Sequence, residues 1–396
     1  MRTIGVEERR ARLGLRHLLA PGTATDDLEE LVRSLVVLHA TDPATVVLSA
    51  LARMAHPDPA QVEAALYDDR SLVRILGMRR TLFTMTRDAV PIVQASSSLR
   101  VAADERRKLE QMLLDAGVTK RPGPWLRKVE AAALAALDEL GEASAPELAA
   151  AVPALDLQLP INQGKRYASK IRLSSRVLLL LGADGLAVRG RPKGSWIGAT
   201  HRWAPASRWL GAPIEAVDPD EARVELVRRW LARFGPGTVA DVQWWTGWTL
   251  GATRAAIAEL DTVEVDLDGE PGLVLAEDEA PVAKPRPWVA LLPGLDPTPM
   301  GWKGRAWYLG PHKTRVFDTA GNVGPTVWMD GRIVGGWAQR KDGSIVTKLL
   351  EEVPAARAKH VDRAAAQLEE LIRKVPSIPR FPAPLDKELR AEGLLA

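Results

Sequence analysis

The chain repeats one order of elements three times, and this order limits the possible fold more than any other feature. In each unit, segments with apolar residues at helical spacing precede two short segments in which apolar and polar residues alternate. Helices followed by a small hairpin are the order of a winged-helix module, in which a β wing completes a helix-turn-helix. The sequence therefore predicts three tandem winged-helix units at irregular spacing, although no close sequence repeat joins them.

The expected boundaries follow the turn and capping residues. The first unit covers 1–108, with helices at 5–20, 26–38, 43–54 and about 59–67 and a hairpin that turns near Met78 to Arg80. The second covers 109–203, with a linker at 110–124, helices at 125–140, after Ser144 and at about 165–181, and a wing from Gly182 to Arg202. The third covers 204–280, with a helix at 220–234, a helix capped by Thr238, a helix from Thr249 to Leu260, and two strands.

Beyond Ala280 the sequence changes character. Short strands broken by Gly, Pro and Asp-Gly turns predict a small β-barrel over 281–353. A closing helix is expected from about 354 to 374, and the Pro-rich tail that ends the region 354–396 is expected to be extended or loosely docked. The predicted fold class is mostly α with β.

Composition excludes several kinds of chemistry. The chain has no cysteine, which excludes disulfides, thiolate nucleophiles, zinc ribbons and iron–sulfur ligation. Its six histidines are scattered without paired-ligand spacing, and no phosphate-binding, dinucleotide-binding or nucleophile-elbow motif occurs, so we expect no metal and no cofactor. Since no signal peptide or membrane span is recognisable, we expect a cytoplasmic protein. We also expect a monomer.

Residues 165–202 form a basic run with nine Lys or Arg against one acid, Asp184. A charge run can be a solvated helix face. This run, however, spans the expected recognition helix and wing of the second unit, the parts of such a module that meet DNA. We therefore predict contact with double-stranded DNA through Lys165, Arg166, Lys170, Arg172, Arg176, Arg191, Lys193 and Arg202.

A short polar corner, His39-Ala40-Thr41-Asp42-Pro43, joins two apolar runs between Leu31 and Met54. A histidine beside apolar residues is often a hydrogen-bonded structural group, Asp-Pro is an ordinary helix start, and Thr41 could be only a capping hydroxyl. Polar side chains held between buried helices are also where chemistry is often found. The pattern alone leaves both interpretations open.

Four ordered blocks resemble a known family. They read LVVLHATDPATVVLSALAR, RLSSRVLLLLGADGLAVRGRP, VALLPGLDPTPMGWKGR and GPTVWMDGRIVGGWAQR. Together they are similar to the bacterial winged-helix DNA glycosylases of the AlkZ and YcaQ type, and the similarity runs over nearly the whole chain. The resemblance implies release of alkylated bases, including bases in interstrand crosslinks, by a C-shaped basic surface built from three winged helices and a small β-barrel.

The same resemblance assigns a catalytic motif to the corner. The family motif is a glutamine, an apolar residue and a second glutamine, which is aspartate in the YcaQ branch, followed by Asp-Pro or a similar pair. Here His39 and Thr41 occupy the two glutamine positions. An N-alkylated purine is cationic and leaves readily, so the enzyme needs mainly to orient a water and stabilise an oxocarbenium-like sugar. We expect His39 to act as a water-positioning base, with Thr41 assisting and Asp42 supplying negative potential.

The third and fourth blocks contain Asp296, Trp302, Arg305 and Arg332. These residues either face the lesion or serve the turns of the barrel, and the sequence leaves both open. No lysine lies in the corner to form a Schiff base, so the predicted activity is that of a monofunctional DNA glycosylase acting on N-alkylated purines. The alternative is a non-catalytic DNA-binding protein, a regulator or lesion sensor; a scaffold that binds no nucleic acid is disfavoured by the basic run.

Overall fold

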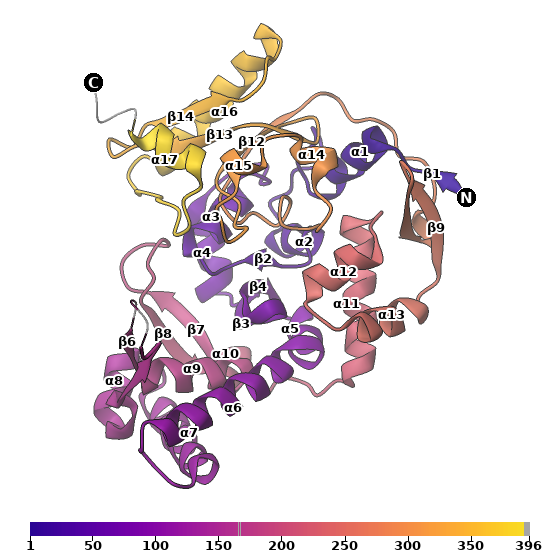
Figure 1. Cartoon of the computed structure of the whole chain (residues 1–396). Helices are drawn as coiled ribbons and strands as arrows, with labels where there is room; N and C mark the ends of the chain where they lie inside the picture. Colours follow the sequence, from indigo (N-terminus) through magenta and orange to yellow (C-terminus); the bar gives the residue numbers. More distant parts are fainter. Residues whose placement is uncertain (165, 167, 392–396) are drawn as a thin grey trace.

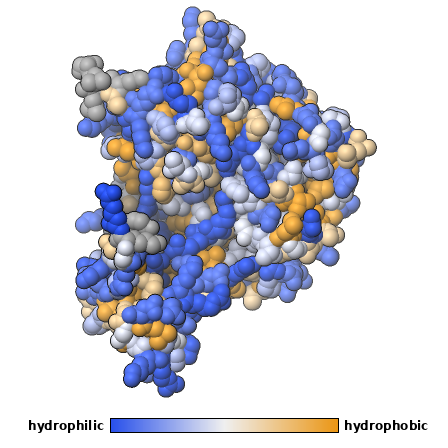
Figure 2. Space-filling model, in the orientation of Figure 1, coloured by the Kyte–Doolittle hydropathy of each residue, from blue (hydrophilic) through white to orange (hydrophobic). Residues whose placement is uncertain are grey.

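The computed structural model describes residues 1–164, 166 and 168–391. Figure 1 shows the first unit at the centre of the molecule, with the second unit, the third unit and the C-terminal region arranged around it. Hydrophilic side chains predominate on the face shown in Figure 2, where apolar ones gather in small patches. The molecule is therefore a mixed α and β protein in which the corner at His39 lies near the middle.

The first unit follows the predicted order. It contains β1 (Arg2–Thr3), α1 (Val6–Arg16), α2 (Leu28–Ser34), β2 (Leu38–His39), α3 (Pro43–Leu51), α4 (Pro59–Tyr67), β3 (Leu72–Leu76) and β4 (Leu82–Thr86). A short 3-10 turn at Met78–Arg80 joins β3 to β4, as predicted. The helix predicted at 26–38 is wrong at its end, because Val36 has a φ of 63° and the next residues pair with β4 in a sheet ordered β2-β4-β3.

The second unit contains an additional hairpin. The first unit ends with α5 (Ala89–Val93) and a π-helical turn (Gln94–Ser98), and α6 (Leu99–Asp115) crosses the predicted boundary at 108. The second unit continues with α7 (Pro122–Leu140), α8 (Ala145–Ala151), a 3-10 turn (Pro153–Asp156), β5 (Gln158–Ile161), β6 (Ser169–Arg172), α9 (Leu173–Ala183), β7 (Ala187–Pro192) and β8 (His201–Pro205), and α10 (Ala206–Leu210) follows it. The β5–β6 hairpin occupies part of the predicted helix at 165–181, so that prediction is wrong at its start. The linker predicted at 110–124 is also too long, since α6 reaches Asp115 and Pro122 begins α7 in the first helical turn, where proline is tolerated.

The third unit matches its prediction closely. It contains α11 (Pro219–Phe234), α12 (Val239–Thr246), α13 (Leu250–Ala258), β9 (Thr262–Leu267), β10 (Glu270–Leu275) and a 3-10 turn (Ala276–Asp278). Thr238 forms a capping box with Asp241, and the Thr249 hydroxyl accepts from the Ala252 N–H, so both predicted caps are present. The parallel pairing of β1 with β9 was not predicted, because the two strands are far apart in the sequence.

The C-terminal region forms an open sheet. Its elements are β11 (Val289–Leu292), α14 (Ala306–Leu309), α15 (Lys313–Val316), β12 (Thr326–Met329), β13 (Arg332–Gln339), β14 (Ile345–Leu349), α16 (Ala355–Ile372) and α17 (Pro384–Ala391). The prediction of a closed barrel is wrong, because the strands run in the order β11-β12-β13-β14 and the two end strands do not pair with each other. Helix α16, which was predicted, packs against both end strands. The tail contains α17, which buries Leu385 and Leu389, and is therefore not merely extended.

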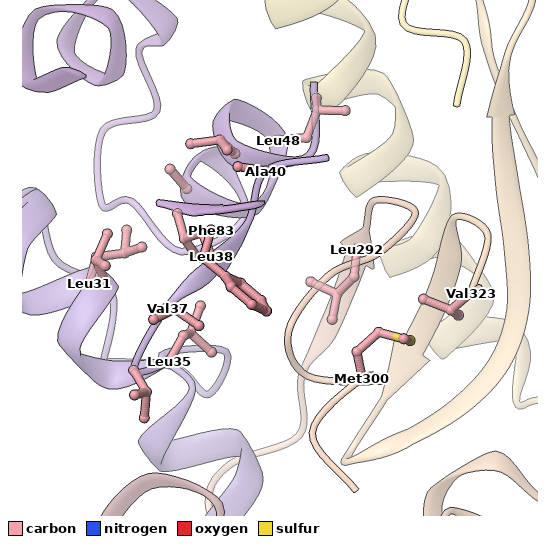
Figure 3. Close-up of a cluster of buried hydrophobic side chains, with 14 of the residues drawn as sticks. Leu31, Leu35, Val37, Leu38, Ala40, Leu48, Phe83, Leu292, Met300 and Val323 are labelled. Atoms are coloured by element: carbon pink, nitrogen blue, oxygen red, sulfur yellow. The ribbon is translucent and has the colours of Figure 1, made fainter. Parts of the chain in front are cut away.

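Three apolar clusters hold the described parts together. The second unit has a core of its own, whereas the first unit, the third unit and the C-terminal region share one larger cluster that Val188 and Trp196 of the second unit join. A small third cluster packs Ile4 against β9 and β10. Figure 3 shows side chains next to the corner, such as Leu38 and Phe83, in one cluster with Leu292, Met300 and Val323 from the C-terminal region. Each fully buried side chain of this size stabilises the fold by about 1.5–3 kcal/mol, so the corner rests on a rigid base.

Two further observations concern the described residues only. Within 1–164, 166 and 168–391, no helix combines the length and apolarity needed to cross a membrane. In the same residues, no group of three or more His, Asp or Glu side chains is arranged to hold a metal ion.

Candidate active site

The corner begins where a short extended strand ends, and its polar side chains flank a buried alanine. The Ala40 N–H donates to the Leu82 carbonyl at 2.8 Å, which continues the pairing of β2 with β4 past His39. Ala40 is buried, whereas His39 and Thr41 are only half-buried. The strand itself ends at His39, and Thr41 lies in the bend that leads to α3.

His39 is held as a neutral imidazole. Its ring contacts Phe83 edge-on at a centroid distance of 5.7 Å, and its Nδ1 accepts from the Thr41 N–H at 3.4 Å. Burial, and secondarily the charge of Arg79, lower the pKa of His39 to about 3. A neutral ring whose Nδ1 accepts a hydrogen bond carries its proton on Nε2. Nε2 makes no hydrogen bond to the described residues, and it can therefore donate to a bound molecule.

Thr41 and Asp42 differ in the number of hydrogen bonds that their side chains make. The Thr41 hydroxyl makes no hydrogen bond to the described part of the chain and is half-buried. Asp42 begins α3, where its Oδ1 accepts from the Ala44 N–H at 3.1 Å, and its Oδ2 accepts from the Arg380 N–H at 2.8 Å. The structural reading of Asp42-Pro43 as a helix start is confirmed. Each carboxylate oxygen thus accepts one backbone hydrogen bond, which holds the Asp42 side chain at the start of α3.

An arginine and tryptophan cluster lies on one side of the corner. Arg79, at the tip of the β3–β4 hairpin, stacks on Trp244 of α12 with 4.2 Å from the guanidinium carbon to the ring centroid. Arg305 contacts the same ring at 4.6 Å and the Phe317 ring at 4.9 Å. Burial and the charge of Arg305 lower the pKa of Arg79 to about 10, so Arg79 remains cationic at neutral pH. Arg79 has a φ of 53°, a conformation that non-glycine residues adopt rarely and mostly at functional sites.

A second group of arginines reaches the corner from the tail and from the second unit. Arg380 donates from its Nη1 to the Thr41 carbonyl at 3.3 Å, in addition to its backbone contact with Asp42. Arg189 of β7 is close enough to Arg380 for the two charges to repel, and burial together with Arg74 and Arg380 lowers the pKa of Arg189 to about 10. The corner thus lies between two groups of cations.

The predicted DNA-binding residues do not form one continuous surface. Four of them make ion pairs with acids on four different elements: Arg172 with Asp156, Arg176 with Glu105, Arg191 with Asp68 and Arg202 with Glu147. Arg166, Lys170 and Lys193 are exposed and make no ion pair with the described residues. Lys165 lies outside the described residues. Since Lys170 and Arg172 lie on β6, the basic run is divided between a hairpin, α9 and the β7–β8 wing.

The four residues considered for contact with a lesion occupy different environments. Asp296 has no exposed surface, and its two oxygens accept from Arg53 at 2.8 and 2.9 Å. Trp302 is buried and donates to the Phe234 carbonyl at 3.0 Å, and Arg332 pairs with Glu351. Among these residues, only Arg305 approaches the corner, through its neighbour Arg79. For Asp296 and Trp302 the structural interpretation explains every polar side-chain atom.

Sequence reasoning did not single out Arg79, Trp244 or Arg380. A weak signal existed for the first, since Met78-Arg79-Arg80 places two arginines at the tip of a predicted hairpin. Trp244 carries no signal beyond its place in a predicted helix, and in the structure it packs against two guanidinium groups. Arg380 lies 338 residues from Asp42 in a tail that carries no local pattern, so no sequence signal could have placed it at the corner.

Comparisons with known proteins agree with this architecture. Residues 32–371 match the family model described as DNA glycosylase AlkZ-like. A relative from Streptomyces sahachiroi, named interstrand DNA cross-link repair glycosylase, is 28% identical over 219 residues, which cover 52% of this chain and only 57% of the relative.

The structure of the Streptomyces sahachiroi DNA glycosylase AlkZ superposes with a TM-score of 0.72 at 22% identity, covering 96% of this chain and 99% of that one. This superposition shows a shared fold. The family match extends over most of the chain, including the corner and both groups of arginines except Arg380. The chain belongs to the AlkZ-like family of DNA glycosylases.

Proposed function

We propose that this protein is a monofunctional glycosylase that hydrolyses the N-glycosidic bond of N-alkylated, cationic purines in double-stranded DNA. Its substrates include interstrand crosslinks, the lesion in the name of its Streptomyces relative, and other bulky adducts. The observation that carries the proposal is the pair of polar atoms at the corner. His39 Nε2 and the Thr41 hydroxyl belong to side chains two residues apart, one at the end of β2 and one in the bend that follows, and neither atom makes a hydrogen bond to the described residues.

These two groups suit the positioning of one water molecule. The neutral His39 can donate from Nε2 to the water oxygen, and the Thr41 hydroxyl can accept one of the water protons. One lone pair of the water then remains free to attack C1′ of the sugar. A bond to a cationic purine breaks with the base leaving as a neutral molecule, so the reaction needs little protonation of the leaving group. Orientation then supplies much of the rate enhancement.

The pKa of His39 decides between positioning and proton abstraction. A base whose conjugate acid has a pKa of about 3 removes a proton weakly at pH 7. Water that adds to an oxocarbenium ion becomes strongly acidic, however, and loses its proton to solvent without a strong base. We therefore assign His39 the positioning role, and the expectation that it also acts as a general base is not retained. Asp42 contributes negative potential through its charge alone.

The surrounding cations suit the rest of the substrate. Phosphates of a DNA strand on either side of a lesion would meet Arg79 and Arg305 on one side and Arg189 and Arg380 on the other. Exposed Arg166, Lys170 and Lys193 of the second unit extend this attraction along the duplex. This arrangement is what we expect if the three helix-and-hairpin units are winged helices around bound DNA. A single protein molecule supplies all of these groups, which is consistent with a monomer.

Release of a base separates the enzyme from its main alternative, a non-catalytic regulator or lesion sensor. That alternative draws support from the loss of both family glutamines and from the engagement of Asp42 in capping. The test is to incubate the protein with a duplex that carries one N7-methylguanine and to measure the free base and the alkali-labile site. We expect single-turnover release well above the spontaneous rate. Intact DNA binding without release from any cationic lesion would establish the alternative.

A further inference from the structure

A group of buried polar atoms without partners lies beside the corner, between β3, α4 and the wing of the second unit. Arg74 of β3 is 3% exposed, and none of its three guanidinium nitrogens makes a hydrogen bond to the described residues. The neighbouring Arg189 Nε, Thr84 hydroxyl and Tyr67 hydroxyl are also buried and without partners. Most buried polar groups in proteins are hydrogen-bonded, so a cluster of exceptions calls for an explanation such as a missing ligand.

The neighbours of Arg74 supply more positive charge, and Glu63 of α4, an acid whose charge acts on Arg74, makes no ion pair with it in the described part of the chain. Its guanidinium lies 5.4 Å from the centroid of the Tyr67 ring, and Arg191 lies 5.0 Å from the same ring. Strand β3 packs against β7, which carries Arg189. Arg191 is neutralised by Asp68, but neither Arg74 nor Arg189 makes an ion pair within the described part of the chain. A buried charge without a counter-ion is strongly unfavourable, so this arrangement favours an anion between the strands.

The cluster extends from the interior to the surface at the corner. Arg74 is buried, Arg189 is half-buried and Arg380 is exposed. Arg380 is in turn fixed at Thr41 and Asp42 by its Nη1 and its backbone N–H. Figure 1 shows the segment between β7 and β8 extending from the second unit toward α4, on the same side of the molecule as the start of α3. An anion that enters from the surface thus meets Arg380 and Arg189 before it approaches Arg74.

We propose that Arg74, Arg189 and Arg380 form a phosphate-binding site that takes one backbone phosphate of the DNA strand whose lesion faces His39 and Thr41. Guanidinium groups bind phosphate oxygens through paired, charge-assisted hydrogen bonds, and the orphaned donors of Arg74 and Arg189 are of the type that this needs. The site fixes the position of the strand relative to the corner, because Arg380 contacts both. This inference rests on the proposed function in that it takes the anion to be part of a DNA substrate.

The test measures binding rather than base release, so that it can succeed even if the protein proves inactive. The duplex carries 2′-fluoro-N7-methyldeoxyguanosine, whose glycosidic bond resists hydrolysis. In a series of duplexes, single phosphates within three nucleotides of the lesion are replaced one at a time by uncharged methylphosphonates. Dissociation constants are measured for the wild-type protein, for Arg189→Gln, and for Arg363→Gln as a control at an exposed arginine of α16.

We expect one methylphosphonate position to weaken binding by the wild type and by Arg363→Gln about tenfold, the size of one lost charge-assisted hydrogen bond. The same replacement should weaken binding by Arg189→Gln distinctly less, because one of the three arginines that bind that phosphate is already missing. Arg380→Gln should show the same coupling between the lost side chain and the methylphosphonate position. Because Arg380 is exposed, this variant serves as a check in case replacement of the half-buried Arg189 disturbs folding. The absence of coupling at every position for both variants would overturn the proposal.

A second arm distinguishes the DNA backbone from a free anion. Inorganic phosphate is added to the wild type and to Arg189→Gln, and the thermal unfolding midpoint is recorded. If millimolar phosphate raises the midpoint of the wild type alone while no methylphosphonate position shows coupling, the site binds a free anion and the assignment to DNA is wrong. Coupling with the duplex supports the assignment whether or not inorganic phosphate also binds.

Discussion

At the scale of single residues, burial decides what each polar side chain of the corner can do. The sequence identified the start of α3 at Asp42-Pro43 correctly, because a helix cap is a local interaction. It could not predict that His39 is neutral, since the cause is burial against Phe83 and a charge from Arg79, which lies 40 residues away. The chemistry of the corner therefore differs from the general base that the residue type alone suggests.

The low pKa of His39 leads to a prediction about pH. With a pKa of about 3, the imidazole is neutral throughout pH 5.5–8, so the rate of base release under single-turnover conditions should be flat over this range. A histidine with an ordinary pKa near 6.5 would be protonated at the lower end, and release would fall there. Rates at half-unit pH intervals provide the check. A decline below pH 6.5 that disappears in His39→Asn would contradict the assigned neutral state.

Asp296 leads to a prediction about stability rather than activity. It is fully buried with Arg53, and its Oδ2 also accepts from the Ser49 hydroxyl at 2.7 Å. Replacing Asp296 with Ala leaves the Arg53 charge buried without a partner, which should lower the free energy of unfolding by about 3–5 kcal/mol. Urea unfolding of the variant measures this loss, with Asp362→Ala as an exposed control expected to change stability by less than about 0.5 kcal/mol. An unchanged urea midpoint for Asp296→Ala would show that the pair is not structural.

At the scale of helices and strands, local signals predicted the elements that carry their own caps and turns. The three caps at Ser144, Thr238 and Thr249 are all present, because each is an interaction over three residues. The signals failed where pairing over long distances decides the structure. Strand β2 replaces the end of a predicted helix because β4 pairs with it, and the β5–β6 hairpin replaces the start of another. The sequence identified the basic residues between 165 and 202. It could not show on which surface each one lies, because the pairing of the strands decides that.

Helix α3 allows the two roles of Asp42 to be separated. Asparagine keeps a side-chain oxygen for the Ala44 N–H, whereas alanine keeps none, so Asp42→Ala should lose about 1 kcal/mol of stability and Asp42→Asn much less. Chemical denaturation of both variants tests the cap. Single-turnover release by Asp42→Asn then reports on charge alone, and we expect a moderate reduction. A rate equal to that of the wild type would exclude any electrostatic role for this carboxylate.

At the scale of the whole molecule, the site is assembled from four distant parts of the chain. The corner comes from the first unit, Trp244 from the third, Arg189 from the second and Arg380 from the tail. The shared apolar core of the first unit, the third unit and the C-terminal region holds most of these parts in place. The sequence predicted the order of these units, but the open sheet and the docking of the tail arise from packing between them, which no local pattern records.

The position of charges on the molecule predicts how DNA binding responds to salt. Lys170 and Lys193 are exposed without ion pairs, whereas Arg172 and Arg202 are paired with acids in the free protein. Replacing both lysines with alanine should reduce the slope of log affinity against log salt concentration by about 2, one for each lost phosphate contact. Replacing both arginines should change it less. The slopes come from dissociation constants measured at salt concentrations between about 50 and 200 mM. If the double lysine variant and the double arginine variant reduce the slope equally, the ion pairs of Arg172 and Arg202 open when DNA binds.

The central claim is that His39 and Thr41 position one water for attack on the sugar. The most direct measurement is the single-turnover rate of N7-methylguanine release by the wild type, His39→Ala, Thr41→Val and the double variant, with His360→Ala as an exposed control. Because both side chains hold the same water, we expect each single variant to lose most of the rate and the double variant to be little slower than either. Undiminished release by the double variant, with the control active, would contradict the claim.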